Sequence, residues 1–411
     1  TGETLKHDAA VQYALSKSDD SLKLPEKYNG LGYQNLISMV FDLMRFRDDW
    51  MREGKAKQAK KDSERAIEPL HLVLVEEPEA HLHVQVQQVF IRKAYDVLTN
   101  HKFIKENENY ATQLVISTHS SHVARETDFA DLRYFKRLSE GSESTIATSK
   151  VINLSDVFGK EDETDKFVTR YLQATHCDLF FADAVILVEG SAENMLLPHY
   201  QRYISILSIN GRHSHRLNPL IEKLCIPTLV IADIDSAENE GHHKAACPER
   251  GKGLISSNYT IAKWLVREND LDKLLAIPSE KKEIIKETPY KYSIRVTYQN
   301  PVVIDYNGTD KEAIASTFED CLVYTNYQLF KGISTDDTGS LVKSVSDEIN
   351  AASSFEDFHK GVYEILRNGK SDQKAEFALD LIYAVDPNKL IVPAYIDEGL
   401  EWLQAYLNPE E

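Results

Sequence analysis

Short hydrophobic runs alternate with longer amphipathic stretches along much of the chain, a pattern that predicts strands separated by helices. The first expected strands are Leu72–Val75 and Gln113–Ser117, with a helix over residues 84–98 between them. The stretch NLISMVFDLM upstream has a helical period, and the charged run MREGKAKQAKKDSER follows it. A strand, a helix and a second strand in this order are typical of a parallel sheet.

The same alternation resumes further along the chain. Strands are expected over Ala184–Val188 and Thr228–Ala232, with a helix between them from Ala192 to about Tyr203. The acidic, turn-rich segment SDVFGKEDETDK precedes them, and we place a domain boundary there, giving domains 1–155 and 156–411. Residues 238–253 have the composition of a loop over a site, and the chain from Lys311 onward is mostly helical in period. The fold class expected is therefore α/β.

Composition restricts the class of protein without naming a function. The 411 residues are 42% hydrophobic and 27% charged, which suits a folded protein of two or three domains. No apolar run approaches the roughly 18 to 20 residues that span a bilayer, and the polar start lacks the pattern of a secretory signal. The four cysteines form no paired framework, which fits a reducing compartment. We expect a cytoplasmic protein.

Two strand ends in the first domain carry residues suited to nucleotide chemistry. The strand Leu72–Val75 runs directly into Glu76 and Glu77, and the next strand is followed by His119. Open α/β sheets bind ligands at such carboxyl ends. One acid can hold a magnesium-bound water, the other can polarise an attacking water, and the histidine can reach a γ-phosphate.

This segment resembles the heads of ABC-type ATPases. The resemblance implies that Glu76 is the Walker B acid, Glu77 the catalytic glutamate and His119 the switch histidine, with residues 79–83 in the D-loop and 29–35 as a degenerate signature segment. No G-x-x-x-x-G-K-[ST] motif occurs, so the loop that cradles phosphates is absent. A truncated chain or a degenerate ATPase would explain this, and the abrupt start favours truncation. We expect ATP to act only in a full-length protein.

Acidic residues follow both strands of the second domain. Glu189 follows the first strand, Glu193 lies four residues later, and Asp233 and Asp235 follow the second strand. Positions i and i+2 of an extended segment share a face, so both aspartates could converge on one cation. Carboxylates gathered in this way raise one another's pKa unless cations lie between them. Oxygen ligands point to Mg2+ or Mn2+, and two such ions can hydrolyse a phosphodiester.

The net charge of −18 argues against tight non-specific binding of nucleic acid by this chain alone. It does not exclude a nuclease, because bound metal ions would cancel the local charge of the carboxylates and let a phosphate backbone approach.

The pairs Glu189-Gly190 and Asp233-x-Asp235 resemble the topoisomerase-primase (Toprim) signature. An ABC-like head followed by a Toprim domain is the arrangement of the overcoming-lysogenization-defect (OLD) nucleases, which include the Gabija-type defence endonucleases. The resemblance covers residues from about 28 to at least 385. It implies a Toprim-type parallel sheet flanked by helices, preceded by the C-terminal half of an ATPase head and accompanied by a further, mostly helical segment.

Two later segments also match that family's pattern. Ser316 and Glu319 have the spacing of a helix capping box, which is their purely structural interpretation. The resemblance implies instead that Glu319 is a metal ligand assisted by the hydroxyl of Ser316. It further implies that Lys374, in the segment KAEFAL, is a catalytic lysine that stabilises charge on the phosphate, with Lys370 as the alternative.

The function expected is metal-dependent hydrolysis of DNA phosphodiesters. One ion would be held by Glu193 with the two aspartates and the other by Glu189 with Glu319. The alternatives are a topoisomerase or primase that uses the same acids, and a non-catalytic, ABC-type DNA-end clamp with vestigial acids. The resemblance implies DNA as substrate, a homodimer, a role in bacterial phage defence and, in some operons, a UvrD-like helicase partner.

Overall fold

The computed structural model of the chain describes most of its length. The described residues are 12–14, 23–25, 30–53, 67–80, 82–138, 146, 148–158, 163–196, 203–209, 214–239, 243–287, 290–333, 340–369, 371–384 and 389–408. Within these residues no helix is both long enough and apolar enough to cross a membrane. The charged run after the first helix lies almost entirely outside them, as does Lys370.

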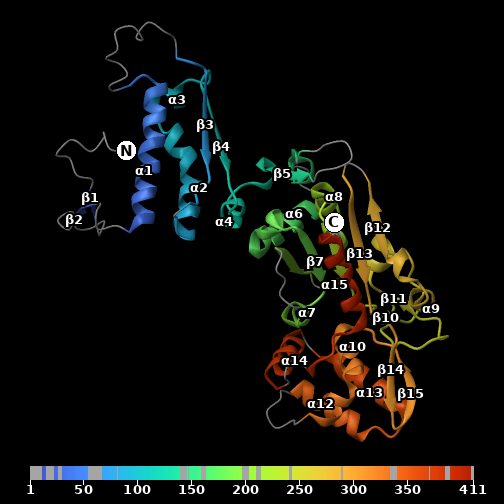
Figure 1. Cartoon of the computed structure of the whole chain (residues 1–411). Coiled ribbons are helices and arrows are strands. Elements are labelled where there is room, and N and C mark those ends of the chain that lie inside the picture. The colour runs from blue at the N-terminus through green and yellow to red at the C-terminus, as the bar shows by residue number, and fades with distance from the viewer. Residues whose placement is uncertain are drawn as a thin grey trace. The chain divides into compact units, whose positions relative to one another are not determined.

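The chain divides into two compact units, which Figure 1 draws without fixing their relative placement. The first comprises residues 1–132 and 169–177, and the second comprises residues 133–168 and 178–411. The domain boundary after residue 155 stays a prediction.

The first unit is built around two parallel strands. These are β3 (Leu70–Glu76) and β4 (Ala111–Ser117), and their register places Leu72 opposite Gln113. The long helix α1 (Leu31–Trp50) and the crossover helix α2 (Val84–Thr99) pack together against the sheet around Leu43, Val73 and Phe90. The order of strand, helix and strand predicted from the sequence is confirmed.

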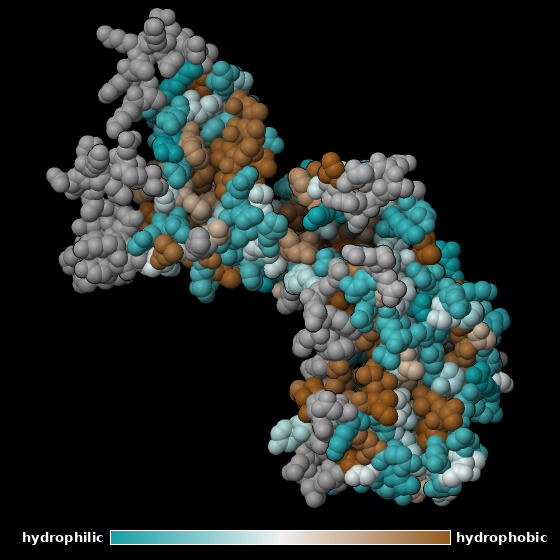
Figure 2. All heavy atoms as spheres, viewed as in Figure 1, coloured by the Kyte–Doolittle hydropathy of each residue, from teal (hydrophilic) through white to brown (hydrophobic). Residues whose placement is uncertain are grey.

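The two faces of this sheet differ in burial. Alternate residues of β3 point toward the helices, so His71 and Val73 are buried while Leu70, Leu72 and Leu74 are exposed. Figure 2 shows hydrophobic side chains gathered on the outer side of these strands. β3 carries apolar residues at positions of both faces. Such a sequence is typical of a strand that is buried on both faces.

A five-stranded sheet forms the centre of the second unit, in the order β12-β13-β9-β7-β8. Strands β13, β9, β7 and β8 are parallel to their neighbours, and β12 is antiparallel to β13. Their bounds are Glu283–Lys286 for β12, Tyr292–Thr297 for β13, Thr228–Ile231 for β9, Ala184–Val188 for β7 and Ile204–Ser208 for β8. The predicted strands β7 and β9 are confirmed, whereas β8, β12 and β13 went unpredicted.

Burial explains why β7 and β9 were visible in the sequence. Every residue of β7 and β9 is buried, because both faces of a parallel sheet are covered, and its central strands are therefore almost entirely apolar. Strand β8 at the edge alternates between buried and half-buried positions. The helix expected from Ala192 to Tyr203 begins as α7 (Ser191–Leu196), and residues 197–202 lie outside the described part.

The remaining C-terminal part is mostly helical, as predicted, after a hairpin of two strands. Figure 1 shows these helices in orange and red around the hairpin and alongside the sheet. The elements are β14 (Val302–Tyr306), β15 (Thr309–Ala313), α10 (Phe318–Thr325), α11 (Tyr327–Gly332), α12 (Ser340–Ala351), α13 (Phe355–Asn368), α14 (Ser371–Ala384) and α15 (Ala394–Leu407). One hydrophobic core joins them to β7 and β9, so the helices hold their side chains in a fixed place relative to the sheet.

Smaller elements complete the chain. They are β1 (Gln12–Ala14), β2 (Lys23–Pro25), α3 (Lys102–Glu106), α4 (Ser121–Arg125), β5 (Arg133–Leu138), β6 (Thr148–Asn153), α5 (Ser155–Phe158), α6 (Glu163–Tyr171), α8 (Asn218–Leu224), β10 (Ser236–Ala237), β11 (Ile255–Ser256) and α9 (Leu271–Leu275). The segment predicted as a loop over residues 238–253 is irregular in its described part, and the β10–β11 pair closes its base.

Candidate active site

The four acids predicted to form a site lie at the ends of neighbouring strands. Glu189 follows β7, Glu193 lies in the first turn of α7, and Asp233 and Asp235 follow β9. Because β7 and β9 are adjacent and parallel, their carboxyl ends meet at one edge of the sheet. Glu189 and Glu193 are both buried. The structure therefore brings these acids together in one environment, as the sequence predicted.

Glu189 is held by two donors on one oxygen. Its Oε1 accepts hydrogen bonds from the backbone N–H of Asp233, at 3.1 Å, and from the side-chain amide of Asn258. The same amide nitrogen donates to the carbonyl of Asp233, at 2.8 Å. Asn258 thus connects the first acid to the backbone of the second.

Asp233 is held by a second buried amide. Gln299 Nε2 donates to Asp233 Oδ1 at 2.7 Å, and Gln299 Oε1 accepts from the backbone N–H of Ile234 at 2.9 Å. The same Nε2 also donates to the hydroxyl of Tyr395 on α15, at 3.3 Å. The side chain of Asp233 is therefore oriented by Gln299, which follows strand β13 and is itself held by Tyr395 of helix α15.

Asp235 does not continue the extended backbone that the sequence suggested. Its φ of 51° is left-handed, and β9 has already ended at Ile231. The expectation that the two aspartates share a face as positions i and i+2 of a strand was therefore wrong. The turn is tied instead to residue 316, since the N–H of Asp235 donates to the Ser316 carbonyl at 3.0 Å and the N–H of Ser236 donates to Ser316 Oγ at 2.9 Å.

The capping box predicted near the start of α10 is displaced by one residue. Thr317 is the N-cap and Asp320 is its partner, rather than Ser316 and Glu319. Asp320 accepts hydrogen bonds from the backbone N–H groups of Ser316 and Thr317, both at 2.8 Å. Because Asp320 caps the helix, Ser316 and Glu319 are released from that structural role.

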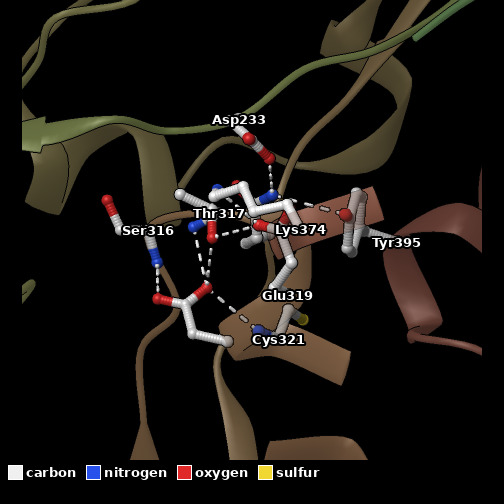
Figure 3. A network of polar contacts seen from close by, with 9 residues as sticks. Asp233, Ser316, Thr317, Glu319, Cys321, Lys374 and Tyr395 are labelled. Atoms are coloured by element: carbon white, nitrogen blue, oxygen red, sulfur yellow. Dashed lines mark hydrogen bonds and ion pairs between the residues drawn. The ribbon is translucent and has the colours of Figure 1, made fainter. Parts of the chain in front are cut away.

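Glu319 instead meets the predicted lysine. Its Oε2 accepts from Lys374 Nζ and from the hydroxyl of Thr317, both at 2.9 Å. Figure 3 shows the Lys374 and Glu319 side chains together beside Thr317, with Asp233 and Tyr395 nearby. Lys374 comes from α14, 55 residues away in the chain, so the C-terminal helices bring a cation to the acidic edge of the sheet.

The electrostatics of the cluster follow from burial and mutual repulsion. Burial raises the pKa of Glu189 well above its usual value, and the charge of Asp235 adds to the effect. Burial and the charges of Glu189 and Glu193 act on Asp233 in the same direction. The pKa of Glu193 rises to about 7, first through burial and then through Glu319. Three acids therefore resist ionisation unless positive charge is supplied.

Lys374 supplies part of that charge. Burial disfavours its ammonium form, but the carboxylates of Glu319 and Asp233 outweigh burial and raise the pKa of Lys374 above its usual value. Lys374 is therefore a permanent cation at neutral pH. Several acids with one lysine leave the cluster negative, which favours additional cations.

The donor set fits divalent metal ions in its chemistry. The acids offer carboxylate oxygens, and Glu193 Oε2 is buried without a hydrogen-bond partner, which is rare for a native polar atom. Among the described residues, however, no three side chains of His, Cys, Asp or Glu are arranged to hold one ion together. The hydrogen bond from Lys374 occupies Oε2 of Glu319, so the lysine side chain would have to rotate away before that oxygen could hold an ion.

Gly190 gives a direct test of the position of Glu193. A Cβ atom at Gly190 would lie 2.7 Å from Glu193 Oε2, too close for that carboxylate to stay where it is. We expect Gly190→Ala to weaken Mn2+ binding about 10-fold, within the 10- to 100-fold range for disturbed metal environments. Titration of Mn2+ followed by electron paramagnetic resonance measures the change. Gly332→Ala, at the exposed end of α11 where a Cβ would meet nothing within 4 Å, is the control, and equal affinities in both variants would contradict the expectation.

The nucleotide residues predicted in the first unit also come together. Glu77 follows β3, and its Oε1 lies 3.3 Å from Nε2 of His119, which follows β4. Glu76 ends β3 itself. Glu79 Oε1 accepts from the hydroxyl of Thr118 and the N–H of His119, both at 2.7 Å, and so fixes the turn that carries the histidine. Their assignment to nucleotide chemistry stays a prediction.

Sequence reasoning missed the amides and the capping acid. Asn258 and Gln299 are polar residues without a motif, and Asp320 stood beside the more conspicuous Glu319. Gln299 lies just after β13, as Glu189 and Asp233 lie just after their strands, but the polar residues within β13 concealed that strand in the sequence.

Comparisons with known proteins agree with this geometry. A family model described as "AAA ATPase domain" matches residues 3–124, and one described as "Overcoming lysogenization defect protein-like, TOPRIM domain" matches residues 180–235. Endonuclease GajA of Bacillus cereus (strain HuB5-5) is 27% identical over 422 residues, which cover 95% of this chain and 55% of that protein. The chain thus spans about half the length of this curated relative. The resemblance inferred from the motifs is confirmed: an OLD-like Toprim domain follows an AAA ATPase domain in this chain.

Proposed function

We propose that the second unit is a metal-dependent DNA nuclease that hydrolyses phosphodiester bonds with two Mg2+ or Mn2+ ions. One observation carries the proposal: buried carboxylates gather at the adjacent carboxyl ends of β7 and β9, with Lys374 among them. Burial, and then repulsion between the carboxylates, raises the pKa of Glu189 and of Asp233. Gathering these carboxylates destabilises the folded chain unless bound cations compensate their charge. Similarity to Endonuclease GajA of Bacillus cereus supports the same reaction class.

The proposed ligands form two sets, one for each ion. Glu193, Asp233 and Asp235 would hold one ion, and Glu189 and Glu319 would hold the other. The hydroxyl of Ser316 lies at the turn after β9, where it accepts from the backbone N–H of Ser236. When bound, such ions activate water and stabilise the leaving oxygen of a phosphodiester.

Lys374 has a role of its own in this scheme. It would leave Glu319 and place its ammonium group against the phosphate as negative charge develops. The Lys374 side chain is partly buried, which weakens the screening of its charge by water and so would strengthen its attraction to the phosphate.

The rest of the proposal concerns the complete protein. ATP would act at Glu76, Glu77 and His119 only together with a phosphate-binding loop, because no such motif occurs in this chain. A homodimer, a cytoplasmic role in phage defence and a UvrD-like helicase partner rest on the family resemblance alone.

Plasmid cleavage tests the proposed function. The chain is incubated with supercoiled plasmid in Mg2+, Mn2+, Ca2+ or chelator, and we expect nicked or linear product in Mg2+ or Mn2+ only. Lys374→Ala should reduce the rate about 100-fold, the order found when one charge-stabilising group is removed. Lys360→Ala is the matched control, because this exposed lysine of the same unit also pairs with a glutamate.

The products separate the proposal from its rivals. Cleavage that continues in chelator would exclude a metal mechanism, and relaxed topoisomers without free ends would assign the same acids to a topoisomerase reaction. Binding of plasmid without any product in all four conditions would favour a non-catalytic DNA clamp.

A further inference from the structure

We propose that Asn258 and Gln299 are positioning residues that orient the carboxylates of Glu189 and Asp233 for divalent metal ions. The inference rests on the proposed function and adds two residues that carry no motif. Neither amide is proposed to touch a metal ion or the DNA.

Asn258 is completely buried and uses its whole amide group. Its Nδ2 donates to Glu189 Oε1 and to the Asp233 carbonyl, and its Oδ1 accepts from the N–H of Thr260 at 2.9 Å. The bond from Thr260 fixes which end of the amide faces the acids, because only the nitrogen end can donate. Asn258 therefore presents donors to Glu189 in one orientation.

Gln299 is also completely buried and holds the turn after β9 from the opposite side. Its oxygen accepts from the N–H of Ile234, and its nitrogen donates to Asp233 Oδ1. One amide therefore binds both the side chain of Asp233 and the backbone of the next residue. The hydroxyl of Tyr395 accepts from the same nitrogen and supports this orientation. The Asp233 carboxylate cannot rotate without breaking a buried hydrogen bond.

The neutrality of the two amides is what suits a metal site. A lysine or arginine in their places would pair with the acids and compete with incoming cations, as Lys374 already does at Glu319. An apolar side chain would remove the donor that Gln299 provides to Asp233 Oδ1, or one of the two donors to Glu189 Oε1. An amide satisfies one oxygen of each acid and leaves the negative charge of the cluster unchanged.

Both bonds fall on a single oxygen of each carboxylate, Oε1 of Glu189 and Oδ1 of Asp233. Fixing one oxygen fixes the direction of the other. A hydrogen bond to the carboxylate oxygen that does not face the metal orients the other oxygen toward it. Loss of such a bond lowers metal affinity about 10- to 100-fold.

The test uses apolar variants of similar size, Asn258→Leu and Gln299→Met. Mn2+ binding to the whole chain is measured by electron paramagnetic resonance, and plasmid cleavage is measured as a function of Mn2+ concentration. We expect each variant to bind Mn2+ at least about 10-fold more weakly. Cleavage should recover in part at high Mn2+, because the ligands themselves remain.

Asn326 provides the matched control. It is buried in the same unit, its Nδ2 donates to the carbonyls of Leu322 and Ile391, and its Oδ1 accepts from the N–H of Ile391. Asn326→Leu therefore removes the same number of hydrogen bonds without touching an acid. It should lower the metal-free unfolding temperature and leave Mn2+ affinity unchanged.

If an apolar variant does not fold, Asn258→Ser or Gln299→Asn replaces it, since each keeps a polar group that is too short to reach its carboxylate. Folded variants with the Mn2+ affinity of the parent chain would overturn the inference while leaving the proposed nuclease intact. A parent chain that neither binds Mn2+ nor cleaves would overturn both.

Discussion

Glu189→Gln should abolish metal-dependent cleavage almost completely, with a loss on the order of 100- to 1,000-fold in rate. The substitution keeps the shape of the side chain and its acceptor oxygen, so the bond from Asn258 can persist. It removes one negative charge from the buried edge where β7 and β9 end. A neutral amide is a weak ligand for Mg2+ or Mn2+, which prefer charged oxygen donors.

The same variant should be no less stable than the parent in the absence of metal. Burial and the charge of Asp235 both oppose ionisation of Glu189, so a neutral side chain at this position relieves repulsion. Plasmid cleavage and thermal unfolding in chelator measure the two effects separately. A variant that loses activity but keeps or gains stability would identify Glu189 as functional rather than structural.

Glu222→Gln is the control for Glu189→Gln. Glu222 lies on α8 in the same unit and forms a half-exposed ion pair with Lys286. An exposed pair contributes little, so stability and cleavage should both stay near those of the parent chain. Full cleavage by Glu189→Gln would contradict the proposed mechanism.

The elements that could be predicted are those whose burial requires a recognisable run of apolar residues in the sequence. Strands β7 and β9 are almost entirely apolar, and an acid follows each of them within two residues, so their pairing and a shared acidic site could be predicted together. Strand β8 lies at the sheet edge and alternates, and β13 contains polar residues that pair with partners inside the fold, as Arg295 does with Glu398. Such strands lack a simple hydrophobic signal.

Only those residues of the candidate site that belong to a sequence motif could be predicted. Glu189, Asp233 and Lys374 could be inferred because the family pattern marks them, and the structure places all three in one cluster. The amides Asn258 and Gln299 act through contacts across 69 and 66 residues of chain, and no local pattern encodes such contacts. The left-handed turn at Asp235 was equally hidden, since aspartate adopts that conformation only in particular contexts.

The shifted capping box shows how a correct spacing can be assigned to the wrong residues. The sequence Ser316-Thr317-Phe318-Glu319-Asp320 offers two overlapping boxes, and local rules cannot choose between them. Tertiary contacts decide between them, because Ser316 Oγ accepts from the backbone N–H of Ser236 and Glu319 Oε2 accepts from Lys374. Asp320 is then the acid left to cap the helix. Tertiary contacts thus assign one acid to structure and its neighbour to the site.

Without metal, the chain should lose stability as the pH rises through about 7. Folding raises the pKa of Glu193 to about 7 through burial and Glu319, and that of Asp320 to about 7 through burial. The pKa values of Glu189 and Asp233 are raised as well. A raised folded-state pKa means that the stabilising contribution is complete below the unfolded pKa of about 4 and is lost as the pH passes the folded value.

The expected size of this loss is large for a single cluster. Each pKa unit corresponds to about 1.4 kcal/mol, so Glu193 alone accounts for a change on the order of 3 kcal/mol between pH 5 and pH 8. Metal should reverse the trend, because cations bind the ionised acids of the folded state and stabilise it by mass action. Unfolding temperatures at pH 5.5, 7 and 8.5, in chelator and in Mn2+, measure both effects.

Glu193→Gln is the decisive variant for this pH dependence. It removes the acid whose Oε2 has no hydrogen-bond partner, so the stability curve in chelator should become flatter and the gain from Mn2+ at pH 8.5 should shrink. The lowered pKa values of Glu268 and Asp357 act at lower pH with the opposite sign and do not affect this window. His71 and His359, whose pKa values are lowered by burial, add an opposite trend in the lower part of this window, so the difference between the variant and the parent chain is the test. A Glu193→Gln chain whose stability falls with pH as steeply as that of the parent would show that Glu193 does not cause the loss.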